Sequence, residues 1–119
     1  MRIEKTMLHG VPVLQVVGDI DHFGAENFLR AAEEVLNGSG ARILLDLETC
    51  PYLDSGGVGV LISLLRRVKA RSGWIGIVAP CDNVRRLLEI VALTRDPDFR
   101  VFADRVGAEA RLQTEAPAV

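Results

Sequence analysis

The spacing of apolar residues predicts several short strands and begins with a hairpin. Residues 3–8 and 11–17 are strand-like runs joined by His9-Gly10, a pair suited to a tight turn, so the two runs should pair antiparallel. Further strands are expected at residues 41–47, 74–79 and 99–102. The first of these three is apolar almost throughout, which is typical of a strand buried on both faces.

Helical spacing of apolar residues separates these strands. The expected helices cover residues 23–36, 54–71 and 84–93, and a last helical segment starts from Asp104. Asp82 is expected to cap the third helix, with Leu87, Leu88 and Val91 facing inward. In the second helix, the side chains expected to face the core are Leu61, Leu64, Leu65 and Val68.

Strands that alternate with helices after an opening hairpin predict an α/β fold. The expected architecture is a mixed β-sheet of four to five strands, flanked on both sides by about four helices. A chain of 119 residues, 49% hydrophobic and 25% charged, suits one domain with a single core. That domain is expected to span residues 1–112, followed by a frayed tail at 113–119.

Three glycines stand where the second helix should begin, in the run Asp54-Ser55-Gly56-Gly57-Val58-Gly59. Each glycine inside a helix costs about 1 kcal/mol relative to alanine, so roughly 3 kcal/mol of local stability is lost here. Bare backbone at this place indicates close approach by a phosphate, a ligand or another protein surface. Unpaired N–H groups and the positive end of the helix dipole favour negative charge at such a terminus.

Composition and charge exclude several classes of function. A net charge of −2 gives no general attraction to nucleic acid or anionic lipid, since both favour a basic face. Cys50 and Cys81 lie outside any Cys-x-x-Cys motif and lack an adjacent His, so neither a metal site nor a disulfide framework is indicated. No signal-like or membrane-spanning run is present, and a cytoplasmic protein without a cofactor is expected.

Four motifs in order resemble a known family. They are Gly18-Asp19-Ile20-Asp21, Leu44-Leu45-Asp46-Leu47, Leu53-Asp54-Ser55-Gly56-Gly57-Val58-Gly59 and Asn83-Val84-Arg85-Arg86-Leu87-Leu88. Together they resemble the STAS domain of bacterial anti-sigma factor antagonists over roughly residues 3 to 112. The resemblance implies a protein that binds an anti-sigma factor serine kinase, thereby freeing a sigma factor for transcription.

The same resemblance implies a phosphorylation switch at Ser55. The kinase would modify this serine and end binding, and a phosphatase acting on phosphoserine would restore it. The family usually has Ser or Thr at the next position, where this chain has Gly56. This departure removes a neighbouring hydroxyl but leaves the phosphoacceptor itself. Asp21 matches an acidic position that helps to engage the kinase.

Physical reasoning on Ser55 agrees with such a switch. A phosphoserine carries about −1.5 to −2 charge, which the start of a helix tolerates, and beside Asp54 it would oppose a partner docked through acidic or apolar groups. At 100° per residue, Ser55, Gly59, Ile62 and Arg66 fall on one side of the helix, and we call these four residues the docking strip. A plain helix cap at Ser55 and ordinary core packing at Ile62 remain as alternatives.

Enzymatic and nucleotide-binding alternatives have weaker support. Ser55, His22 and an Asp could in principle form a nucleophilic triad. However, a nucleophile elbow has a glycine two residues before the serine, and this chain lacks it. The glycines also lack the spacing of a dinucleotide or phosphate loop, although the resemblance leaves a weak nucleotide site near Ser55 open. No catalytic residue is therefore expected.

The sequence thus predicts a regulatory binding module whose partner contacts are Asp21, Asp54, Ser55, Gly56, Gly59, Ile62 and Arg66. The alternative function is a STAS subunit of a lipid-transport or stress-signalling assembly that docks a partner without phosphorylation. The identity of the sigma factor and the role of Asp46 stay open at this stage.

Overall fold

A computed structural model describes residues 1–39 and 41–115, which fold around one mixed sheet. Its strands lie in the order β1-β2-β3-β4-β5. They are β1 (Arg2–Leu8), β2 (Val11–Val17), β3 (Arg42–Asp46), β4 (Trp74–Val78) and β5 (Phe99–Phe102). Only β1 runs antiparallel to its neighbour, and His9 and Gly10 make the turn with φ of 48° and 79°, as a two-residue hairpin of this hand requires.

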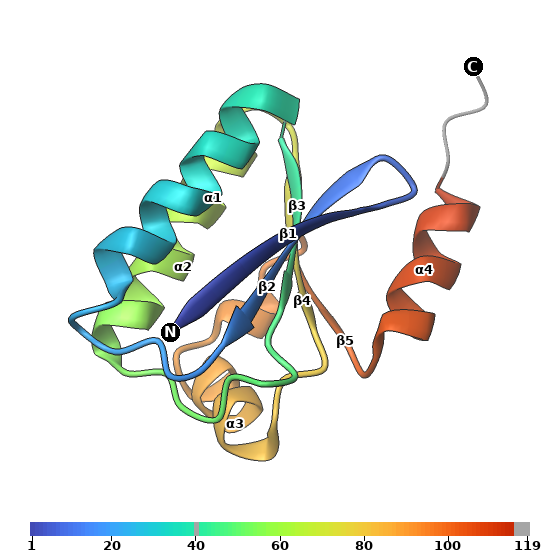
Figure 1. Ribbon diagram of the computed structural model, residues 1–119. Coiled ribbons are helices and arrows are strands. Elements are labelled where there is room, and N and C mark those ends of the chain that lie inside the picture. The colour runs from blue at the N-terminus through green and yellow to red at the C-terminus, as the bar shows by residue number, and fades with distance from the viewer. Residues whose placement is uncertain (40, 116–119) are drawn as a thin grey trace.

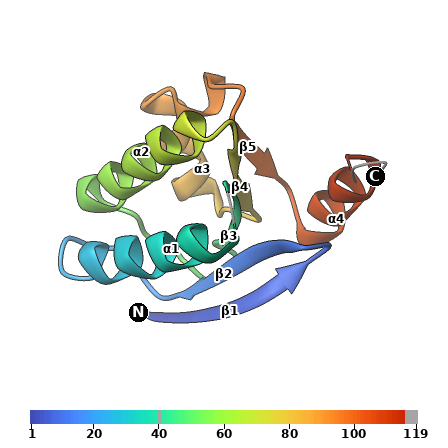
Figure 2. The same ribbon diagram turned by 90° about the horizontal axis from the view of Figure 1, so that it is seen from above.

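The helices cover both faces of this sheet unequally. They are α1 (Ala25–Ser39), α2 (Ser55–Ala70), α3 (Asp82–Ile90) and α4 (Arg105–Thr114), with a short 3-10 helix η1 (Leu93–Arg95). α1, α2 and α3 lie on one face and α4 lies on the other, while Figure 2 shows α1 and α2 side by side (Figures 1 and 2). The predicted mixed α/β architecture, with its opening hairpin, is confirmed.

Alternation along the central strands divides the core into two layers. Ile43 and Leu45 of β3 face the layer under α1 to α3, whereas Leu44 between them joins Ala108 and Leu112 of α4 in the second layer. Side chains point to opposite faces with a period of two, so a strand with helices on both sides must be apolar at every position. This explains the continuous apolar run that the sequence shows here.

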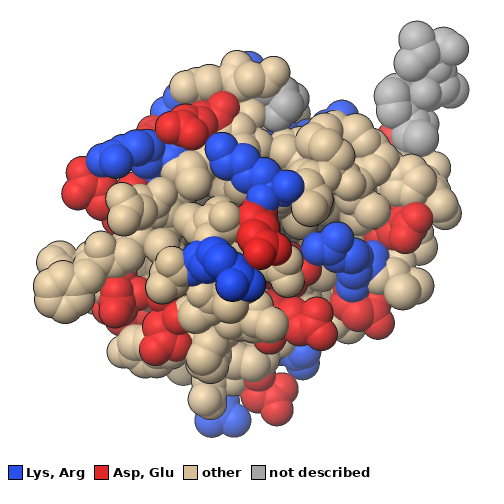
Figure 3. All heavy atoms as spheres, viewed as in Figure 1, with Lys and Arg blue, Asp and Glu red and all other residues tan. Residues whose placement is uncertain are grey.

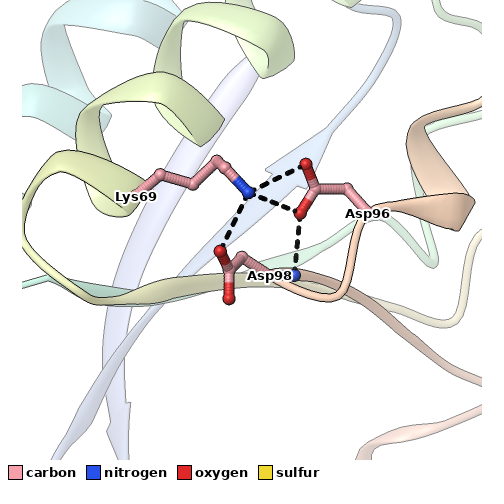
Figure 4. Close-up of polar contacts among 3 residues, drawn as sticks. All are labelled: Lys69, Asp96 and Asp98. Atoms are coloured by element: carbon pink, nitrogen blue, oxygen red, sulfur yellow. Dashed lines mark hydrogen bonds and ion pairs between the residues drawn. The ribbon is translucent and has the colours of Figure 1, made fainter.

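Polar contacts anchor α2 at both ends. At its start, Asp54 is the N-cap residue and its carboxylate accepts hydrogen bonds from the backbone of the first turn. Near its end, Lys69 Nζ lies 3.0 Å from Asp96 Oδ1 and 3.0 Å from Asp98 Oδ2, in the segment before β5 (Figure 4). The N–H of Asp98 and the Lys69 ammonium hold the pKa of Asp96 below its usual value, and the two carboxylates raise the pKa of Lys69. The helix that begins at Ser55 is thus fixed in position at each terminus.

Several predicted details of the last helices are wrong. α3 begins after Cys81, the N-cap residue, so Asp82 lies inside the first turn and does not cap it. Val84 and Leu88 are the buried residues of α3 and Leu87 is partly buried against the core, while Val91, predicted to face inward, is 38% exposed. α4 continues to Thr114, past the predicted boundary at 112, and residues 116–119 of the expected tail lie outside the described part of the chain.

Candidate functional site

Two loops at the carboxyl ends of β2 and β3 pair with each other and frame the start of α2. Ile20 forms an isolated parallel bridge with Leu53. The N–H of Ile20 donates to the carbonyl of Tyr52 at 3.0 Å, and the N–H of Asp54 donates to the carbonyl of Ile20 at 3.2 Å. Ile20 and Leu53 are both buried, so apolar packing and backbone bonds fix the two loops together. The residues singled out by two separate sequence motifs therefore meet at one end of the sheet.

Asp54 connects these loops through its side chain. Its Oδ1 accepts hydrogen bonds from the N–H of Gly56 at 2.9 Å and of Gly57 at 3.1 Å, and its Oδ2 accepts one from the N–H of His22 at 2.8 Å. Charge-assisted bonds of this kind are stronger than neutral ones. The prediction of unpaired amides in the first turn is thus wrong for Gly56 and Gly57, because Asp54 already occupies them.

Ser55 is the first residue of α2 and is exposed to solvent. The alternative in which Ser55 caps the helix is wrong, since Asp54 has that position. Within residues 1–39 and 41–115, the Ser55 hydroxyl has no hydrogen-bond partner, and His22 reaches this region through its backbone N–H. The hydroxyl is free to meet an external group, and the geometry of a nucleophilic triad is not formed in this part of the chain.

The three glycines of the motif have different surroundings. None has a positive φ, so a left-handed turn does not explain them. A Cβ at Gly57 would lie 2.2 Å from Leu53 Cδ1, and one at Gly56 would lie 3.2 Å from the Cα of His22. A Cβ at Gly59 would meet nothing within 4 Å. Packing therefore accounts for Gly57, Gly56 has only a tight fit against Asp54 and His22, and the fold gives no reason for a glycine at Gly59.

The docking strip is a mixed surface. Ser55, Gly59 and Arg66 are exposed, whereas Ile62 is half-buried and packs against the core beneath α2. Core packing at Ile62 is thus confirmed for the part of the side chain that contacts the core, and its role as a docking residue stays a prediction. Arg66 has no ion-pair partner in the described residues.

Asp21 is half-buried and makes hydrogen bonds within its own loop. Its Oδ1 accepts a hydrogen bond from the N–H of Gly24 at 2.9 Å, and its carbonyl accepts from Gly24 and Ala25. The residue is half-buried and stabilises the turn that leads into α1. The sequence predicted Asp21 only as a partner contact, which stays a prediction, and the structure adds a structural task in this turn.

A groove beside Ser55 was not predicted from the sequence. It has a volume of about 630 Å³ and lies between the loop before α2 and the face of α3. The residues that line it are Pro51, Tyr52, Leu53, Asp54, Ser55, Val58, Asn83, Val84, Leu87 and Val91. Of these residues Tyr52 is 53% exposed, and Ile90, the last residue of α3, is 72% exposed. The signal in the sequence was the spacing of Asn83, Leu87 and Val91 along one side of a helix, which core packing also explains.

Other polar residues have structural tasks. Asp46, buried to 3% exposure, accepts a hydrogen bond from Arg105 Nη2 at 2.8 Å and another from the N–H of Glu48 at 3.1 Å. Asp46 thus joins the end of β3 to the start of α4, which answers the question left open by the sequence. Cys50 is buried, and burial raises the pKa of its thiol, while Cys81 is half-buried.

Among the described residues, no group of three His, Cys, Asp or Glu side chains is arranged to hold a metal ion. In the same part of the chain, each helix is too short or too polar to cross a bilayer.

Comparison with known proteins gives consistent relatives. The anti-sigma-F factor antagonist RsfB of Mycobacterium tuberculosis is 30% identical over 95 residues, which are 80% of this chain and 75% of that protein. The anti-sigma F factor antagonist of Lysinibacillus sphaericus is 24% identical over 82 residues, or 68% of this chain and 70% of that protein.

Solved structures share the fold. An anti-sigma factor antagonist from Mycobacterium paratuberculosis superposes with a TM-score of 0.82 at 23% identity, covering 94% of this chain and 93% of that one. The Bacillus cell fate determinant SpoIIAA, in its phosphorylated form, gives a TM-score of 0.72 at 21% identity over 93% of this chain and 99% of that one. A family model described as the STAS domain matches residues 2–108, and the chain therefore belongs to the STAS domain family.

Proposed function

We propose that this chain is an anti-sigma factor antagonist, which binds an anti-sigma factor serine kinase around Ser55 and is released when the kinase phosphorylates this residue. The observation that carries the proposal is the state of Ser55, an exposed helix-start residue whose hydroxyl is unused within the described residues. The names of the relatives from M. tuberculosis and L. sphaericus point in the same direction. Bacillus SpoIIAA, a structural relative, exists in both unphosphorylated and phosphorylated forms.

The surface next to Ser55 suits a protein partner. The groove is lined largely by apolar residues, among them the exposed Tyr52, and α3, which forms one side of it, ends in the exposed apolar side chain of Ile90. Exposed apolar area with a polar rim is typical of interaction sites. Gly59 lets another backbone approach α2 closely, because no Cβ stands between them.

Phosphorylation would change charge more than structure. The three N–H donors on the Asp54 carboxylate stabilise its charge, and a phosphate on Ser55 would add about −1.5 to −2 charge next to it. The fold would be retained, since Ser55 packs against nothing that must move. A partner that covers this surface with acidic groups would then be repelled. A partner that covers it with apolar groups would have to strip the phosphate of its water and bury the charge unpaired, which is costly.

The test compares how a negative charge at each of two serines of α2, Ser55 and Ser63, changes the affinity for the kinase. Ser55→Ala should bind the kinase as the unmodified protein does, whereas Ser55→Asp should bind at least about tenfold more weakly, both measured by titration calorimetry with purified kinase. Ser63→Asp is the matched control, since Ser63 is exposed on α2 but turned about 80° away from Ser55. Mass spectrometry after incubation with kinase and ATP should find phosphate on Ser55 and none on Ser55→Ala.

Equal affinities of Ser55→Ala and Ser55→Asp would contradict the switch. Co-purification of a transporter or scaffold subunit in place of a kinase, with no phosphate on Ser55, would instead favour the alternative of a non-phosphorylated STAS subunit.

A further inference from the structure

Phe23 is the most exposed large apolar side chain in the described part of the chain. It is 89% exposed, compared with 74% for Val106 and 72% for Ile90. This phenylalanine contributes almost nothing to the core and exposes a large apolar surface to water, so packing within the chain does not explain it. The residue stands in the loop between β2 and α1, two positions after Asp21.

The loop that presents Phe23 is held in a defined conformation. On one side, the N–H groups of Gly24 and Ala25 donate to the carbonyl of Asp21, and Gly24 also donates to the Asp21 carboxylate. On the other side, the N–H of His22 donates to Asp54 Oδ2, and the ring of His22 contacts the ring of Phe23 edge-on, with 5.8 Å between centroids. A loop whose backbone is fixed in this way loses little conformational freedom on binding, which favours affinity.

The surroundings of Phe23 are acidic. A hollow beside it is lined by Asp19, Asp21, Asn27, Gly24 and Met1, and no Lys or Arg side chain is among the lining residues. Asp19 is exposed and belongs to no ion pair among the described residues. In the space-filling view, the β2–α1 loop projects at the left edge with acidic groups next to it (Figure 3). The complementary surface is therefore an apolar cavity with arginine or lysine at its rim.

The loop is also joined to the site around Ser55. Asp54 bonds both His22 and the first turn of α2, and a Cβ at Gly56 would lie 3.2 Å from the Cα of His22. A partner that covers Ser55 and extends over the β2–α1 loop would meet Phe23 without any change of conformation.

We propose that Phe23 is an apolar anchor of this interface, inserted into a cavity of the partner kinase that is rimmed by basic side chains. The inference rests on the proposed function, because it names a contact of the same partner. A guanidinium at the rim would lie over the face of the Phe23 ring and pair with Asp19, so a cation–π contact and an ion pair would act together.

The test uses purified kinase and the full chain. Phe23→Ala should bind the kinase at least about tenfold more weakly, as is usual for a buried aromatic anchor, with the thermal midpoint unchanged. Val106→Ala is the matched control, since Val106 is 74% exposed but lies on α4 at the opposite face of the sheet. Asp19→Asn should leave stability unchanged and reduce the dependence of affinity on salt, which reports the basic rim.

Three results would overturn the anchor. The first is wild-type affinity for Phe23→Ala while Ser55→Asp still weakens binding, in which case the proposed function stands without this contact. The second is an Asp19→Asn variant with the same salt dependence as the wild type, which would exclude the basic rim. The third is a self-associated wild-type chain that Phe23→Ala turns into a monomer in sedimentation, since a second copy would then be the occupant. Failure of the wild type to bind any serine kinase would instead refute the proposed function.

Discussion

Replacement of Gly59 by alanine is expected to stabilise this protein. Gly59 lies inside α2 with no positive φ, and the added Cβ would meet no atom within 4 Å. Alanine is favoured over glycine in a helix interior by about 1 kcal/mol, partly because it restricts the unfolded chain. For a domain of this size, that gain corresponds to a rise of about 3–5 °C in the thermal midpoint.

Gly57→Ala is the comparison that makes this test sharp, because both glycines belong to the same helix. The Cβ at Gly57 would lie 2.2 Å from Leu53 Cδ1 and 3.0 Å from Ile20 Cγ2, in the buried layer under α2. Overpacking of this kind costs about 1–3 kcal/mol, which exceeds the gain of about 1 kcal/mol in helix propensity. A net loss of about 1 kcal/mol is expected.

Urea or guanidinium unfolding of the two variants and the wild type gives the free energy of unfolding directly, provided that the slope m stays the same. A Gly59→Ala variant less stable than the wild type would refute the reasoning, since no contact in the structure accounts for a loss. Equal gains for both variants would show that Leu53 and Ile20 move aside freely. Kinase affinity measured on the stabilised Gly59→Ala variant then tests whether a partner needs the bare backbone at this position.

Three further outcomes are expected. Asp46→Ala should lower the free energy of unfolding by about 2 kcal/mol, less than for a fully buried pair because Arg105 is 43% exposed, as chemical denaturation can measure. Asp21→Ala should lower it by about 1 kcal/mol through loss of a cap-like hydrogen bond, and an unchanged value would show that the turn does not need it. Lys69→Ala should have a lower thermal midpoint than the wild type when both are measured at any pH from about 5 to about 10. The stabilisation by the ion pair is lost as pH falls through the lowered pKa of Asp96, because the carboxylate becomes protonated. It is also lost as pH rises through the raised pKa of Lys69, because the ammonium loses its proton. A difference in thermal midpoint between variant and wild type that does not change with pH would contradict the ion-pair explanation.

The sequence by itself determined the order and type of the elements. An alternating apolar run indicates a strand buried on one face, and a continuous apolar run indicates one buried on both. Helical spacing of apolar residues indicates a helix with one buried face, so neighbouring residues alone predict each kind of element. The hairpin at His9-Gly10 and the core positions Leu61 and Leu64 followed from such local rules and are confirmed. The motif around Ser55 was also visible, because three glycines at a helix start conflict with helix propensity.

Only the tertiary structure decided what each residue of that motif does. Gly57 and Gly59 look alike in sequence, yet one faces Leu53 and Ile20 and the other faces open space. Asp54 and His22 are separated by 32 positions, and their bond exists because two strand ends lie side by side. The exposure of Phe23 and the groove beside Ser55 likewise depend on how separate segments pack, and no local pattern records which side chains remain uncovered once they have done so.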